Sequence, residues 1–151
     1  MTHSFKYEGP GCGKDFLIHS FDFSYGTDAV NGAPAEHGAV AALDIEVQME
    51  AAQDSEGTNF KAARTELWAA SKNAIELKGE ALRSKITVVA HQTAQDSGTR
   101  KLVLEGWCAS YHESSHGSPQ GANSDIIRAR FYIFGTKRAN AAGGQSGPVL
   151  S

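Results

Sequence analysis

The chain has 151 residues, of which 40% are hydrophobic and 21% charged, a composition typical of one soluble globular domain. Its net charge of −3 gives no broad basic surface for nucleic acid, and no window approaches the ~20 apolar residues of a membrane span. We therefore expect one domain over residues 1–138, a flexible tail over 139–151, and neither nucleic-acid binding nor membrane insertion.

The N-terminus has no basic start followed by an apolar stretch. We expect synthesis and folding in the cytoplasm and, for a secreted protein, export without a cleaved signal peptide. The two cysteines, Cys12 and Cys108, have no paired spacing, which favours free thiols in a reducing compartment. Their spacing alone leaves a disulfide between them open.

The first third of the chain predicts an opening hairpin. Ser4–Glu8 alternates weakly, a glycine-rich turn follows, and Asp15–Gly26 reads as a strand with Phe21, Phe23 and Tyr25 on one face. The turn, GPGCGKD, resembles a phosphate loop only superficially, because it lacks the first glycine of that motif and the hydroxyl residue after the lysine. A turn between two strands is the better interpretation.

The segment Gly26–Gly38 is rich in Gly, Pro, Asn and Asp and has no period, so it predicts a long exposed loop. Beyond it the chain predicts strands around one helix, Asn59–Lys72, with Phe60, Ala63, Leu67 and Trp68 on its apolar stripe. The strands are expected at Gly38–Glu50, Ala74–Leu77, Lys85–His91, Lys101–Tyr111 and Asp125–Phe134.

Residues 112–116, HESSH, spell the zinc-protease pattern HExxH. That chemistry needs a helix, because helical i, i+4 spacing aims both imidazoles at one metal. Here a strand-like run precedes the motif, and Gly117 and Pro119 follow it. We interpret His112 and His116 as loop histidines, and we assign no catalytic residue, metal or cofactor.

Two predicted strands carry opposite charges on their polar faces. Leu43, Ile45, Val47 and Met49 alternate with polar residues, which predicts one buried and one wet face. The wet faces either provide solubility or line a solvated wall or a subunit interface, where opposite charges set register and partner choice. The candidate lumen or subunit-interface residues are Asp44, Glu46, Gln48, Arg128 and Arg130.

The order of these features resembles the tube protein of bacterial type VI secretion systems, the Hcp or TssD family, and of related phage tail tubes. The matching pieces are FDFSYG, TDAVNGAP, GAVAALDIEVQME, a single central helix, LEGWCASYHES and IIRARFYIF. Cys108, Tyr111 and Glu113 stand where that family has a Cys-x-x-Tyr-x-Glu strand before its last strand, with His112 as a spacer.

The resemblance implies a mainly β protein: a small β-barrel of two packed antiparallel sheets with one α-helix. It implies a structural subunit without enzyme activity, which forms hexameric rings that stack into a hollow tube. The implied partners are further copies of the chain, the sheath, spike and baseplate proteins, and effectors in the lumen. The implied ring-stacking residues lie in the Gly26–Gly38 loop: Asp28, Asn31, Pro34, Glu36 and His37.

Two other classes remain open. A monomeric β-barrel that binds a small ligand would line its cavity with Phe21, Phe23, Tyr25 and Trp107. A zinc hydrolase, which fits the sequence less well, would use His112, Glu113 and His116.

Overall fold

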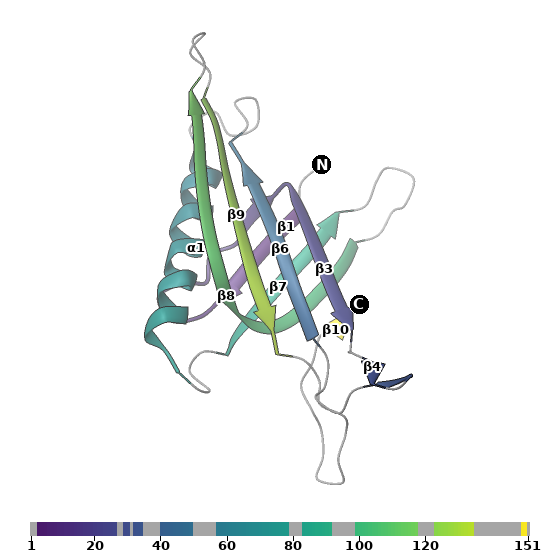
Figure 1. The fold of residues 1–151 in the computed structure, drawn as a ribbon. Coiled ribbons are helices and arrows are strands. Elements are labelled where there is room, and N and C mark those ends of the chain that lie inside the picture. Colours follow the sequence, from purple (N-terminus) through teal and green to yellow (C-terminus); the bar gives the residue numbers. More distant parts are fainter. Residues whose placement is uncertain are drawn as a thin grey trace.

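The computed structural model describes residues 3–26, 29–30, 32–34, 40–49, 57–78, 83–91, 99–117, 123–134 and 149–150. These residues form a mainly β fold with one long helix, as predicted (Figure 1). The elements are β1 (His3–Glu8), β2 (Phe16–Ile18), β3 (Ser20–Gly26), β4 (Ala29–Val30), β5 (Ala33–Pro34), β6 (Val40–Gln48), α1 (Thr58–Glu76), β7 (Ser84–His91), β8 (Thr99–Gly117), β9 (Asn123–Ile133) and β10 (Val149–Leu150).

The described strands other than β4 and β5, which form a two-stranded sheet, belong to one antiparallel sheet, and the predicted division into two packed sheets is not seen among them. Seven of the described strands are ordered β2-β1-β7-β8-β9-β6-β3, and β10 pairs with β8 beside this path. The strands at its two ends, β2 and β3, are not paired with each other, so the sheet is not closed into a barrel. They are consecutive in the chain, however, with His19 alone between them.

Strand β8 joins two halves of the sheet. Its 19 residues pair with β7 along the first half, Thr99–Gly106, and with β9 along the second half, Gly106–Gly117. One strand therefore belongs to both halves of the sheet, and Figure 1 shows it curving between them. The register shifts between Cys108 and Ser110, a bulge of the kind that bends a strand.

The core lies between the two halves of the sheet, where the rings of Phe5 in β1 and Phe131 in β9 have centroids 5.4 Å apart, and it includes the buried face of α1. The period-two pattern of β6 is confirmed. Leu43, Ile45 and Val47 are buried and Met49 packs against them, while the intervening polar residues are partly exposed. The largest fully buried side chains come from both halves of the sheet and from α1: Tyr7, Phe5, Phe131, Ile18, Leu43, Leu67, Ile86, Leu104, Ile127, Val47 and Val88.

The helix is longer than predicted. Phe60, Ala63 and Leu67 are buried as expected, but Trp68 is 56% exposed, so its assignment to the apolar stripe is wrong. One residue beyond Leu67 turns the side chain by ~100° around a helix, which carries it to the rim of the buried face. The predicted strand at Ala74–Leu77 is also wrong, because α1 continues to Glu76.

Side chains of α1 make hydrogen bonds to the turn between β1 and β2. The predicted glycine-rich turn is present, with the Cys12 N–H donating to the Gly9 carbonyl at 3.2 Å. The Glu66 carboxylate accepts from the Gly13 N–H at 2.8 Å, and the Asn73 amide donates to the Pro10 carbonyl at 2.8 Å. The turn is thus a docking point for the helix.

Of the predicted flexible tail, residues 139–151, the structure describes only Val149–Leu150. These two residues form β10 and pair with Val103 and Leu102 of β8. A two-residue ladder on the side of a long strand attaches this end of the chain to the domain.

Gly106 is the position where we expect substitution to be most disruptive. A Cβ there would collide with the Tyr132 carbonyl oxygen and lie 2.9 Å from Ile133 Cδ1. Gly106→Ala should lower the free energy of unfolding by about 1–3 kcal/mol, because backbone atoms cannot move aside as a flexible side chain can. Urea denaturation measures this.

Gly26→Ala is the matched control, since a Cβ at Gly26 meets nothing within 4 Å. It should stay within about 0.5 kcal/mol of the unmodified protein. Equal stabilities of the Gly106→Ala and Gly26→Ala variants would contradict this role of Gly106.

Candidate interaction surface

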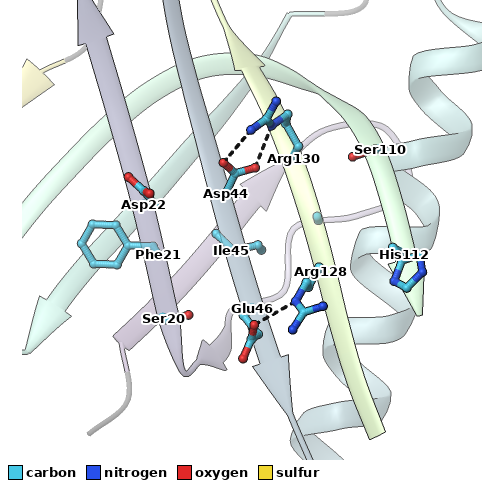
Figure 2. Close-up of a pocket in the computed structure, with 11 residues that line it drawn as sticks. Ser20, Phe21, Asp22, Asp44, Ile45, Glu46, Ser110, His112, Arg128 and Arg130 are labelled. Carbon is cyan, nitrogen blue, oxygen red and sulfur yellow. Dashed lines mark hydrogen bonds and ion pairs between the residues drawn. The ribbon is translucent and has the colours of Figure 1, made fainter. Parts of the chain in front are cut away.

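Charged side chains gather on the outer face of β3, β6, β9 and the second half of β8. The β6–β9 register places Asp44 directly opposite Arg130 and Glu46 directly opposite Arg128. We call this face the charged wall, and Figure 2 shows its side chains over an open concavity of about 570 Å³. Its members are Ser20, Asp22, Asp44, Glu46, Ser110, His112, Arg128 and Arg130.

Each arginine of the wall is paired with the carboxylate facing it across the strands. Arg130 binds Asp44 through two bonds, Nε to Oδ1 at 2.8 Å and Nη2 to Oδ2 at 3.0 Å. Arg128 Nε donates to Glu46 Oε2 at 3.0 Å, and Gln48 Nε2 donates to Glu46 Oε1 at 2.6 Å. The two-bond geometry fixes the guanidinium plane of Arg130 against its partner.

The partners of Glu46 and Arg130 favour the charged forms of these two residues. Hydrogen bonds from Gln48 and then Arg128 lower the pKa of the Glu46 carboxyl. The hydrogen bond and charge of Asp44 raise the pKa of Arg130. Ion pairs as exposed as these contribute little to stability. The pairs therefore define a pattern of charge and strand register more than they stabilise the fold.

The wall contains all the charged residues proposed for it and others that were missed. Asp44, Glu46, Arg128 and Arg130, which were predicted on the polar faces of two strands, lie on one shared face, and Gln48 joins them by its bond to Glu46. Ser20, Asp22, Ser110 and His112 were not predicted, although they alternate in the same way. Alternation assigns a residue to one face of a strand. Which residues of other strands lie beside it depends on the strand order and on the pairing register.

The predicted ring-stacking loop is only partly covered by the structure. Asp28, Asn31, Glu36 and His37 lie outside the described residues. Pro34 lies in β5, where it pairs with Ala29 of β4. The loop therefore contains a short hairpin instead of being wholly irregular, and Gly32 between the two strands has φ 80°, a left-handed conformation suited to glycine.

The prediction that the HESSH motif lies in a loop is wrong, because the motif lies inside strand β8. Four residues along a strand separate His112 from His116 by ~13 Å, much too far for one zinc ion. Glu113 instead accepts a hydrogen bond from the Tyr111 hydroxyl at 3.0 Å and pairs with Arg64 at 3.0 Å. Among the residues that the structure covers, no group of three or more His, Cys, Asp or Glu could hold a metal.

The four aromatic residues suggested for a ligand cavity do not converge. Trp107 lies edge-on to Tyr132 across the β8–β9 ladder, with ring centroids 5.3 Å apart. Phe21 and Phe23 pack against the core, and Tyr25 is 50% exposed. Cys108 is also buried in the core, and this burial raises its pKa to about 12. A thiol in that state is a poor nucleophile at neutral pH.

Comparison with known proteins leaves the function to be argued from geometry. A scan against protein-family models and a search of curated proteins each found no match to this chain. In the part of the chain that the structure describes, no helix combines the length and the apolar character needed to cross a bilayer. The charged wall is the feature on which a functional argument can be built.

The lowered pKa of Glu46 predicts a pH dependence of stability. A carboxyl with a lower pKa in the folded state stabilises the fold above its unfolded pKa of about 4.3, and this contribution is lost as pH falls through the folded pKa. Glu46→Gln should therefore lose less stability than the unmodified protein between about pH 5 and pH 3. Urea midpoints across this range measure the difference.

Glu76→Gln, at the exposed end of α1, is the matched control and should follow the unmodified protein. Identical acid profiles for the Glu46→Gln variant and the unmodified protein would count against the ion-paired wall.

Proposed function

We propose that this chain is the structural subunit of the inner tube of a type VI secretion, or related contractile injection, machine. In this proposal it forms hexameric rings that stack into a hollow conduit for effectors. The observation that carries the proposal is the charged wall: a continuous, internally paired face of four neighbouring strands, backed by a filled apolar core.

A barrel-like subunit is part of the proposal. Strand β8 pairs with β7 by one half and with β9 by the other, and β2 runs into β3 through His19. The His19 N–H also donates to the Glu46 carbonyl at 2.9 Å, which ties this junction to β6. These contacts support an Hcp-like arrangement in which the two halves of the sheet wrap around one core.

The chemistry of the wall suits the lining of a conduit. Asp44 and Glu46 are each neutralised by an arginine directly opposite, so the face holds water while presenting little net charge from these pairs. A cargo protein of either sign would then find few strong attachment points. The subunit acts mechanically, without turnover or cofactor.

The same proposal defines partners and route. The subunit binds further copies of itself, the sheath, spike and baseplate proteins, and effectors in the lumen. It is made in the cytoplasm and leaves the cell with the tube. Nucleic acid and membrane insertion have no part in this function.

Imaging of a loop variant tests the proposal. Replacing residues 27–38 by a short Gly-Ser linker should leave ring-shaped particles in negative stain but prevent their stacking into tubes, because the proposed stacking contacts lie in this segment. Replacing residues 92–98, between β7 and β8, in the same way is the matched control and should spare both rings and tubes. The absence of rings from the unmodified protein at every concentration would contradict the proposal.

A further inference from the structure

A second surface lies where α1 runs beside the second half of β8. Its lining includes Trp68, Lys72 and Ile75 of α1 and Trp107 and Tyr111 of β8, around a hollow of about 410 Å³. We call it the α1–β8 groove. Ile75 is 81% exposed and Trp68 is 56% exposed, the two largest values among the large hydrophobic side chains described.

The aromatic side chains of the groove are held by contacts within the chain. The Trp68 ring lies edge-on to Tyr111 with centroids 5.6 Å apart, and the Tyr111 hydroxyl is held by Glu113 at 3.0 Å. Lys72 brings a positive charge to this apolar hollow and has no ion-pair partner in the described part of the chain. Apolar exposure of this kind marks a surface that binds a partner.

The opposite edge of the same half-sheet has the complementary chemistry. Strand β3 ends the path, and its Tyr25, 50% exposed, stacks on Phe23 with centroids 6.3 Å apart. Asp22 faces Asp44 across the β3–β6 ladder, but Arg130 already occupies Asp44. Two carboxylates opposite each other repel, and Asp22 has no cation of its own among the described residues (Figure 2).

We propose that the α1–β8 groove binds the β3 edge of a second copy of this chain. Tyr25 supplies the aromatic group for the exposed apolar side chains of the groove, and Asp22 supplies the carboxylate for Lys72. The groove and the β3 edge lie at opposite ends of the β8-β9-β6-β3 order, so the contact is head-to-tail. Contacts of this type repeat in one direction and close into a ring when the rotation allows it.

This inference rests on the proposed tube function, because it names the contact that closes the ring. The charged wall supports it further. Ser110 lines both the wall and the groove, so the wall reaches the groove on one side and β3 on the other. Copies joined in this way would present one continuous charged face.

Ile75→Asp tests the groove. Ile75 is almost fully exposed in the single chain, so the variant should keep its circular dichroism spectrum and melting temperature. Its self-association, measured by sedimentation velocity, should weaken at least tenfold, because a carboxylate would enter an apolar contact. Thr65→Asp, at an exposed position of the same helix outside the groove, is the matched control and should assemble normally.

Charge reversal tests the identity of the partner. Asp22→Lys and Lys72→Glu should each reduce assembly, and the double variant should restore it. Because the two positions lie on opposite edges of the subunit, restoration requires a contact between copies.

The failure of this inference can be told apart from failure of the tube function. If the unmodified protein forms rings that Ile75→Asp leaves unchanged, or if the double reversal does not recover assembly, the groove is not the ring contact and the tube function stands. If the unmodified protein never self-associates, both are overturned.

Discussion

The fold depends on one strand that serves two ladders. Gly106 of β8 is the residue shared by the pairings with β7 and with β9, and it lies so close to the Tyr132 backbone that a Cβ would not fit. A glycine inside a strand suits a tight bend or a close approach of another backbone. The two ladders of β8 join β7, β1 and β2 on one side to β9, β6 and β3 on the other.

The bend gives the second half of β8 two different environments. On its outer side it contributes Ser110 and His112 to the charged wall, and at its edge Trp107 and Tyr111 meet α1 in an apolar groove. In the wall, Asp44 and Glu46 are ion-paired with Arg130 and Arg128 of the same chain, whereas the groove exposes large apolar side chains. We infer that the wall faces water and the groove faces protein, which is the division of surfaces that a ring-forming subunit needs.

The local sequence pattern predicted most of the strands and the helix. The pairing of distant strands determined which side chains share the charged wall. Leu43, Ile45 and Val47 were placed in the core from alternation alone, because a half-buried strand repeats every two residues. Joining His112 and Asp22 to the wall needed the pairing of distant strands, which no local period encodes. Likewise no local pattern shows that β8 pairs with both β7 and β9 and so joins their strands into one path.

The most direct test of the account is the solution mass of the purified, unmodified protein by light scattering across a range of concentrations. The account predicts a species near six times the 16.0 kDa chain mass, because the proposed tube subunit forms hexameric rings and a head-to-tail contact can close into such a ring. A single 16.0 kDa species at every concentration would contradict it.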